Sequence, residues 1–142
     1  METAKEICEA FGVVPGDVKT YSPLALAYIG DAIYDLIIRT VVVERGNRAA
    51  EKLHKATIQF VKAETQARMI ETLQDSLTEE EKAVYKRGRN AKSASTAKNA
   101  TVGDYRKATG FEACLGYLYL TNQMDRAMEI VKNGIDAVEM EL

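Results

Sequence analysis

The sequence predicts an all-α protein with a single domain, and three observations support that prediction. The chain has 142 residues, which is the length of one domain of ordinary size. Its two prolines, Pro15 and Pro23, both lie near the start, so helices can run through the rest of the chain. No internal repeat or strand-like alternation of apolar and polar residues is visible.

The first long helix is expected from Pro23 to about Val43. Ser22 can cap its N-terminus, and proline suits the first helical position because the N–H that it lacks would be unpaired there. The segment RGN at 45–47 is a stop signal. Although this stretch is nearly long enough to span a membrane, three charged residues interrupt it: Asp31, Asp35 and Arg39. We therefore expect a buried helix and no membrane partner.

The remaining helices follow from apolar periodicity and end signals. A helical region covers Arg48 to Leu73, with a break expected at Thr57. Thr78 caps a helix that has three glutamates in its first turn, where the helix dipole favours them, and Gly88 is expected to end it. A further helix is predicted from about Asp104 to Leu120. The turn TNQ then leads into a last amphipathic helix.

Composition limits the cellular setting and the cofactors. The two cysteines, Cys8 and Cys114, are far apart and form no CxxC motif, and the acidic N-terminus lacks the features of a signal peptide. These features predict a cytoplasmic protein. No glycine-rich phosphate-binding motif occurs, so no nucleotide cofactor is expected. We expect one domain over 1–142, with a core at about 21–134 and an N-terminal extension at 1–20.

Basic residues are concentrated in one segment, although the net charge of the chain is −2. The range 86–107 holds seven Lys or Arg residues and one acid. Within it, residues 89–103 are small and polar without an apolar period, which predicts a long loop of the kind that is usually functional. A local basic surface is typical of a polyanion site. A solvated lysine-rich loop is the alternative interpretation.

Two apolar helices each carry a lone acid, Asp31 and Glu112. Each acid has a glycine close to it in sequence, Gly30 and Gly116. Glycine inside a helix costs about 1 kcal/mol relative to alanine, and close approach of two helices is the usual reason for it. If the two helices pack at these glycines, the two acids can face each other.

A pair of buried carboxylates predicts a cation. Without a cation, two such groups are expensive to bury, and Mg²⁺ is commonly held by one or two carboxylates and several waters. Such an ion can activate water against a phosphodiester. Two alternatives stay open. Thr109 and Glu112 have the spacing of a capping box, and Asp31 could pair with a buried tyrosine or with Arg39.

Two motifs resemble those of the ribonuclease III family. The segment LAYIGDAIYDL is similar to the family signature, an apolar helix around Glu-Phe-Leu-Gly-Asp. The segment TGFEACLGYLYL is similar to its second motif, Asp-x-x-Glu-Ala-x-x-Gly. Both occur in the family's order and at a similar spacing, and RGRNAK and YRKATGFEA resemble the short branch called Mini-ribonuclease III. The resemblance covers roughly Tyr21 to Gly134, and no double-stranded-RNA-binding domain is expected after it.

The resemblance implies a catalytic site and a homodimer. Asp31 and Glu112 match the family's essential acids, which bind Mg²⁺, with Mn²⁺ able to substitute, and activate water to cleave double-stranded RNA. Tyr28 matches a dimer-interface phenylalanine. Three positions at which the longer enzymes carry acids differ here: Leu24, Ala27 and Thr109. These differences predict weaker metal binding.

The resemblance also suggests a role in ribosomal RNA maturation, on the large-subunit precursor. We expect the basic segment to bind the RNA duplex through six residues: Arg87, Arg89, Asn90, Lys92, Ser93 and Lys98. The missing acids motivate a rival hypothesis, a non-catalytic RNA-binding or ribosome-associated protein on the same fold. A helical nucleotide pyrophosphohydrolase is a third hypothesis, but it would need more than one facing pair of acids.

Overall fold

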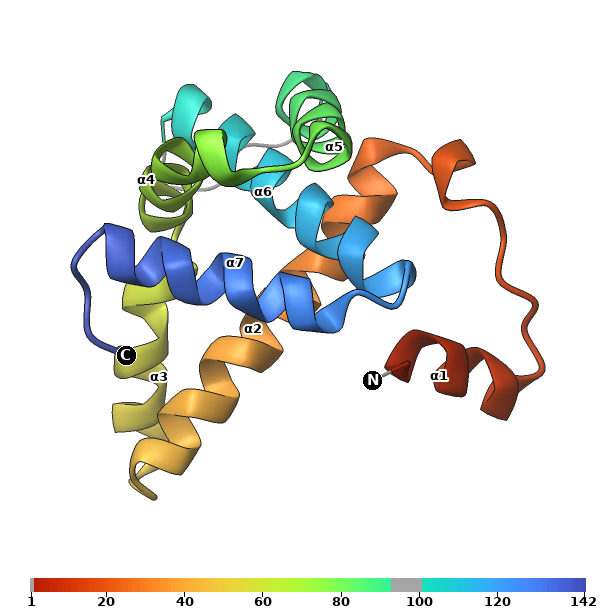
Figure 1. Cartoon of the computed structure of the whole chain (residues 1–142). Helices are drawn as coiled ribbons and strands as arrows, with labels where there is room; N and C mark the ends of the chain where they lie inside the picture. Colours follow the sequence, from red (N-terminus) through yellow and green to blue (C-terminus); the bar gives the residue numbers. More distant parts are fainter. Residues whose placement is uncertain (1, 93–100) are drawn as a thin grey trace.

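The computed structural model describes residues 2–92 and 101–142, and within them every regular element is a helix (Figure 1). The elements in chain order are α1 (Thr3–Phe11), η1 (Val18–Thr20), α2 (Pro23–Arg45), α3 (Ala50–Val61), α4 (Ala63–Leu73), η2 (Gln74–Ser76), α5 (Glu79–Asn90), α6 (Val102–Leu120) and α7 (Met124–Ala137). The all-α prediction is confirmed. Over the described part of the chain, no helix has the length and apolarity needed to cross a membrane.

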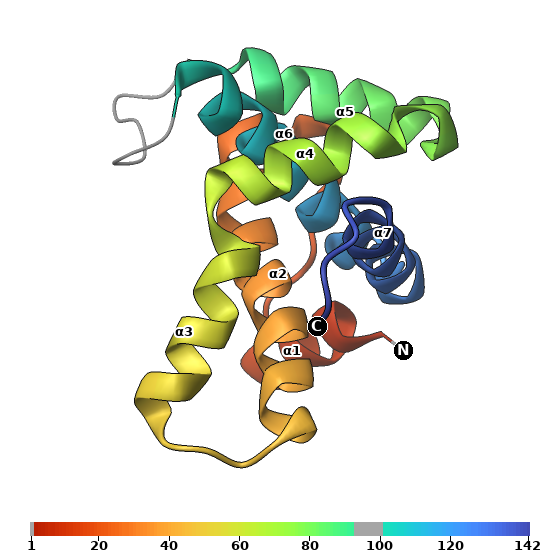
Figure 2. The same cartoon turned by 90° about the vertical axis from the view of Figure 1, so that its left-hand side faces the viewer.

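Helix α6 is the centre of the fold and packs against α1, α2, α4, α5 and α7 (Figures 1 and 2). Its middle is buried on nearly all sides, because apolar residues occupy most positions from Ala108 to Tyr119. The ring of Phe111 meets Tyr34 of α2 edge to face, with ring centroids 5.6 Å apart. Side chains of α4 and α7, including Ile70 and Ile130, complete this core.

Helices α2 and α6 cross at glycines, as the sequence predicts. A Cβ atom added to Gly30 would lie 1.7 Å from the carbonyl oxygen of Glu112. A Cβ added to Gly116 would lie 2.0 Å from the carbonyl oxygen of Leu26. Any side chain at either position would push the two backbones apart. The glycines therefore set the distance at which the two acidic motifs meet.

The expected end of a helix at Gly88 is wrong, since α5 continues to Asn90. Gly88 is buried where α5 crosses α6, and a Cβ there would lie 2.9 Å from the Cα of Gly110. The glycine thus serves close packing between helices rather than helix termination. The predicted Thr78 cap is confirmed and forms a full capping box with Glu81.

The break between α3 and α4 lies at Lys62 and not at Thr57, which corrects the predicted position. Lys62 has an extended backbone, with φ −69° and ψ 150°, and Figure 2 shows the sharp bend that results. Thr57 lies buried within α3, where its hydroxyl donates to the carbonyl of Leu53 at 2.9 Å. Such back-bonding satisfies a threonine inside a helix, so Thr57 does not interrupt it.

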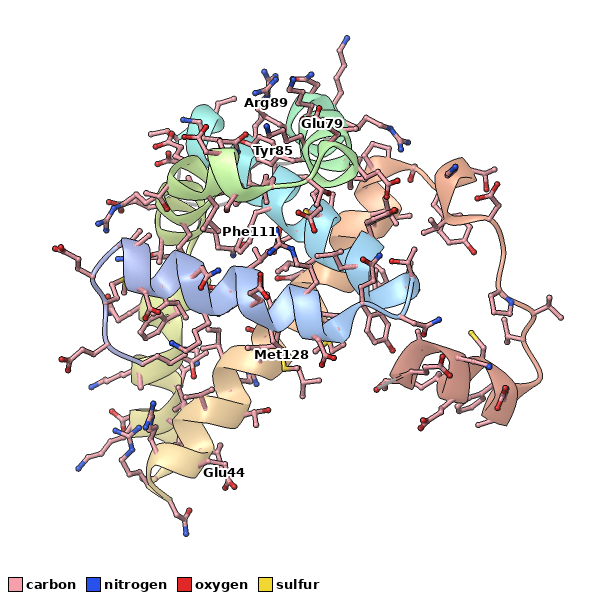
Figure 3. All side chains as sticks on the ribbon, in the orientation of Figure 1. Glu44, Glu79, Tyr85, Arg89, Phe111 and Met128 are labelled. Atoms are coloured by element: carbon pink, nitrogen blue, oxygen red, sulfur yellow. The ribbon has the colours of Figure 1, made fainter. Side chains whose placement is uncertain are left out.

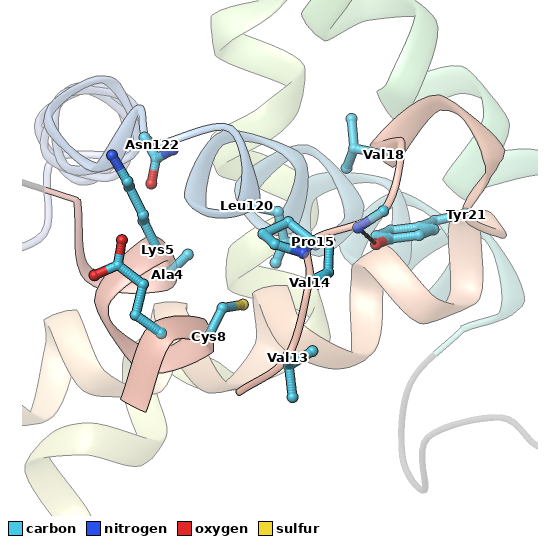
Figure 4. A pocket seen from close by; sticks show the side chains of 12 residues that line it. Ala4, Lys5, Cys8, Val13, Val14, Pro15, Val18, Tyr21, Leu120 and Asn122 are labelled. Carbon is cyan, nitrogen blue, oxygen red and sulfur yellow. Dashed lines mark hydrogen bonds between the residues drawn. The ribbon is translucent and has the colours of Figure 1, made fainter. Parts of the chain in front are cut away.

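The N-terminal segment forms a helix and an extended connection beside the end of α6. Helix α1 is capped at its C-terminus by Gly12, which has φ 66°, and Ala4 of this helix is buried. A cavity of about 380 Å³ lies among α1, the segment 13–16 and Leu120 (Figure 4). Tyr21 and Gly16 also line this cavity, and the hydroxyl of Tyr21 accepts a hydrogen bond from the backbone N–H of Gly16 at 3.0 Å.

Candidate active site

The crossing of α2 and α6 brings Asp31 and Glu112 together, as the glycines predict. Both carboxyl groups line the same cavity, and each affects the charge of the other. Burial raises the pKa of Glu112 to about 9, and the hydrogen bond and charge of Asp31 add to that rise. The expectation that both acids are buried is wrong for Asp31. Asp31 is exposed at the mouth of the site, while Glu112 is half-buried behind it.

A cavity of about 400 Å³ contains this pair. One face of α2 and one face of α6 line it, each with the helical spacing i, i+3, i+4 and i+7. The α2 residues are Leu24, Ala27, Tyr28 and Asp31, and the α6 residues are Tyr105, Ala108, Thr109 and Glu112. Val61, Ala63 and Gln66, from the bend between α3 and α4, complete the wall.

The contacts exclude two of the structural alternatives, the capping box at Glu112 and the pairing of Asp31 with Arg39. Thr109 lies inside α6 and its hydroxyl donates to the carbonyl of Tyr105 at 2.9 Å, so it does not cap a helix at Glu112. Within the described residues, the ion pair of Arg39 is with Asp35 at 3.4 Å and not with Asp31.

Gln66 is part of the site and was missed by the sequence reasoning. Its side chain is 3% exposed, and its Nε2 donates to the carbonyl oxygen of Val61 at 2.8 Å. Hydrogen bonding from Gln66 to Glu112 opposes the rise in the pKa of that carboxyl. A signal was available, because Gln66 falls within the apolar stripe of Ala63, Ile70 and Leu73, where a polar residue is out of pattern.

The family of the chain follows from comparison with known proteins. A family model of the ribonuclease III domain matches residues 24–123, which include both acids and the whole cavity. The chain belongs to the ribonuclease III family. The predicted enzyme class, an endoribonuclease, is therefore confirmed.

Named members of the ribonuclease III family resemble the chain over most of its length. A Mini-ribonuclease 3 of Clostridium tetani is 52% identical over 124 residues, which is 87% of this chain and 82% of that protein. A Mini-ribonuclease 3 of Thermoanaerobacter sp. is 48% identical over 86% of each chain. A crystal structure of a Fusobacterium nucleatum protein is 31% identical and has a TM-score of 0.77, covering 86% of this chain and 98% of that one. The predicted resemblance to Mini-ribonuclease III is confirmed.

The three positions at which longer ribonuclease III enzymes carry acids, Leu24, Ala27 and Thr109, all line the same cavity as Asp31 and Glu112. None of the three brings a charge, so the site is left with two carboxyl groups. In the described part of the chain, no cluster of three or more His, Cys, Asp or Glu residues is placed to hold a metal ion. A cation here would depend on Asp31 and Glu112.

These residues nevertheless suit a hard divalent cation. The two carboxyl groups lie in one cavity, where their charged forms would repel each other, and a cation held by both would relieve that repulsion. The Oε1 atom of Gln66 is also the buried side-chain oxygen that lacks a hydrogen-bond partner among the described residues. An all-oxygen set of this kind is what Mg²⁺ and Mn²⁺ prefer.

The basic residues predicted to bind RNA lie at the end of α5, outside the cavity. Arg89 stacks over the ring of Tyr85, with its Cζ 5.6 Å from the centroid, and donates to Asn90 Oδ1 at 3.3 Å (Figure 3). Arg87 is exposed and donates to the carbonyl of Tyr21 at 3.1 Å. Lys92 is exposed just after the helix, while Ser93 and Lys98 lie outside the described residues.

Tyr28 stands at the rim of the cavity and is 82% exposed. Other large apolar residues are exposed on the same helix: Leu24, Leu36 and Val43. An exposed apolar surface of this kind is typical of an interface. It is compatible with the predicted role of Tyr28 in a dimer.

Proposed function

We propose that this protein is a Mg²⁺-dependent endoribonuclease that cuts double-stranded RNA at the cavity between α2 and α6. The observation that carries the proposal is the meeting of Asp31 and Glu112 at the two glycines, inside a ribonuclease III domain. A cation held there would activate water for attack on phosphorus and stabilise charge on the leaving oxygen. Mn²⁺, with similar ligand preferences, would substitute.

The two acids have different roles in this proposal. The carboxyl of Glu112 has a pKa of about 9 and so holds a proton at neutral pH in the metal-free protein. Asp31 and Glu112 would hold the cation, and Glu112 would have to lose its proton to do so, because metal ligands must be deprotonated. Exposed Asp31 is the first group that an incoming cation or phosphate meets, and half-buried Glu112 is held by packing and by Gln66.

We infer that the RNA duplex lies across the cavity mouth and the end of α5. Arg87, Arg89, Asn90 and Lys92 at that end, with Ser93 and Lys98 beyond it, would contact phosphates and 2′-hydroxyls. Recognition of this kind reads the shape of an A-form duplex rather than its sequence. We take the loop at 89–103 as the main RNA contact and residues 21–134 as the catalytic core.

We further propose that the enzyme is a homodimer, with Tyr28 in the interface and one active site for each strand. The exposed apolar residues of α2 support this assembly. Maturation of ribosomal RNA in the cytoplasm, on the large-subunit precursor, is the proposed cellular task. The family resemblance supports the task, and the unpaired thiols of Cys8 and Cys114 support the compartment.

The experiment that tests this function is cleavage of a long RNA duplex by the purified protein, resolved on a denaturing gel. We expect fragments with Mg²⁺ and none with EDTA, and no cutting of either separated strand. A mobility shift of the duplex without any cutting in Mg²⁺ or Mn²⁺ would instead support a non-catalytic RNA-binding protein. That result would overturn the proposal.

A further inference from the structure

Gln66 lies in the wall of the candidate active site and is held in one orientation. It projects from α4, one turn after the bend at Lys62, and lines the cavity with Asp31 and Glu112. Its Nε2 donates to the carbonyl oxygen of Val61 at 2.8 Å. Turning the amide over would place Oε1 against that carbonyl, and two acceptors cannot bond. The position of Oε1 is thus set by the backbone.

The Oε1 atom of Gln66 is buried without a hydrogen-bond donor, and among the described residues it is the one buried side-chain nitrogen or oxygen atom in that state. An unsatisfied buried acceptor costs about 1–3 kcal/mol. Such atoms are rare in folded proteins and call for an explanation, often a functional one or a missing water or ion. Leucine would fill the same space without this cost, so stability alone does not account for glutamine here.

The neighbours of Gln66 indicate what the missing donor is. The amide lines the same cavity as the carboxyl groups of Glu112 and Asp31. Leu24, Ala27 and Ala108 of the same wall are apolar and offer nothing to a cation. Mg²⁺ held by two carboxylates keeps several waters, and those waters need acceptors.

We propose that Gln66 is a positioning residue of the cation site, whose Oε1 accepts a hydrogen bond from a water in the hydration shell of a divalent cation held by Asp31 and Glu112. This inference rests on the proposed function. Gln66 would add an oxygen to the wall of a cavity in which Leu24, Ala27 and Thr109 stand where longer family members carry acids. The cavity of about 400 Å³ has room for a cation and several waters.

The test is the affinity of the metal-free protein for Mn²⁺, measured by electron paramagnetic resonance of the free ion. Gln66→Leu removes Oε1 at similar volume, and we expect the dissociation constant to rise about tenfold, as for other groups that orient a metal's ligands. Gln66→Glu keeps an acceptor oxygen, and with its carboxyl protonated it can still donate to the carbonyl of Val61, so it should bind Mn²⁺ about as tightly as wild type. Gln74→Leu is the matched control. Gln74 also donates its Nε2 to a helix carbonyl, that of Ile70 at 3.1 Å, but it lies outside the cavity.

The outcomes separate this inference from the proposed function. Unchanged Mn²⁺ affinity in Gln66→Leu, together with a clear loss in Asp31→Asn, would overturn the role of Gln66 and leave the metal site standing. Wild-type affinity in Asp31→Asn would overturn the metal site itself. Should Gln66→Leu fail to fold, Gln66→Glu decides, because weaker Mn²⁺ binding in that variant contradicts an acceptor role. A loss of affinity in Gln74→Leu as large as that in Gln66→Leu would also contradict it.

Discussion

Glu81 and Glu112 are two acids withdrawn from water, and their surroundings affect them in opposite ways. Burial alone would raise the pKa of Glu81, but Arg126, with both side-chain hydrogen bonds at 2.9 Å, and the capping contacts of Thr78 hold it below its usual value. Glu112 has no such cation, and its nearest charged partner is Asp31. Glu81 is therefore structural, while the arrangement around Glu112 is one that only a ligand would complete.

The raised pKa of Glu112 predicts a stability penalty at neutral pH. The folded value of about 9 lies above the ordinary value of 4.5, so the folded state binds the proton more tightly. The free energy of unfolding should therefore fall as pH rises from about 4.5 to about 9. Glu112→Gln removes this dependence. In EDTA at pH 8, we expect the free energy of unfolding of Glu112→Gln to exceed that of wild type by on the order of 1–2 kcal/mol.

Thermal unfolding followed by circular dichroism at pH 5 and pH 8 checks this expectation. The gain should be much smaller at pH 5, because pH 5 lies just above the ordinary value of 4.5 and little of the penalty has built up there. Glu51→Gln is the control, because Glu51 is an exposed acid on α3 that pairs with Lys55. An equal gain at both pH values, or a similar gain in the control, would show that ionisation of Glu112 does not destabilise the folded state.

At the scale of elements, the site depends on how three helices meet. Glycines let α2 and α6 touch, and the bend at Lys62 turns α4 so that Gln66 forms part of the wall. The interior of α6 is packed on nearly every side, so a shift of α2 has no free space to enter. The geometry of the carboxyl pair is thus a property of the packed core and not of a loop.

Gly30→Ala should disturb both the fold and the site. The new Cβ would meet the carbonyl of Glu112 at 1.7 Å, so the helices must separate. We expect a loss of about 2–4 kcal/mol in the free energy of unfolding, measured in urea. Gly46→Ala is the control, because a Cβ there has only Arg48 Nε nearby, at 3.9 Å. Equal stability of the two variants would contradict close packing at the crossing.

Particular residues show which parts of this arrangement could be predicted from sequence. Ser22 with Pro23, and Thr78 with Glu81, mark helix starts through neighbours in the chain, and both signals proved correct. Gly88 was misread as a helix end because its partner, Gly110, is distant in sequence. Gln66 was missed for the same reason, since its place in the wall depends on the bend at Lys62. Local signals predict elements, whereas exposure and cavities depend on long-range packing.

At the scale of the whole molecule, charge is unevenly distributed. The chain is slightly acidic, yet Arg87, Arg89 and Lys92 gather where α5 ends. Binding of an RNA duplex there should be strongly dependent on salt, because phosphate contacts release counterions. The exposed apolar residues of α2 lie on a different element and would serve assembly.

Replacement of Arg89 and Lys92 by alanine should weaken duplex binding and reduce its dependence on salt. We expect affinity to fall about tenfold, and the slope against salt concentration to fall by about one for each cation removed. Fluorescence anisotropy at several salt concentrations measures both, in an Asp31→Asn background so that the RNA stays intact. Lys55→Ala with Lys132→Ala is the control, since each of these exposed lysines lies away from α5 and pairs with an acid on its own helix, α3 or α7. An unchanged slope would remove the end of α5 from the RNA contact.

Tyr28→Asp should convert a dimer into monomers. The introduced carboxylate would be unpaired and removed from water at the centre of an apolar interface, which costs several kcal/mol. Analytical ultracentrifugation should give the variant half the mass of wild type. Val14→Asp is the matched control, because Val14 is also largely exposed, at 88%, but lies on the N-terminal segment. A wild-type mass for Tyr28→Asp would place any interface elsewhere.

The central claim is that Asp31 and Glu112 form the cutting site, and one measurement tests it most directly. Wild type, Asp31→Asn and Asp35→Asn are incubated with a long RNA duplex and Mg²⁺, and the fragments are resolved on a denaturing gel. Asp35, which pairs with Arg39 on the same helix and lies outside the cavity, is the control. The account predicts cutting by wild type and Asp35→Asn, and at least a thousandfold loss, on the order of the effect of removing a key catalytic group, in Asp31→Asn with duplex binding retained. Cutting by Asp31→Asn at the wild-type rate would contradict it.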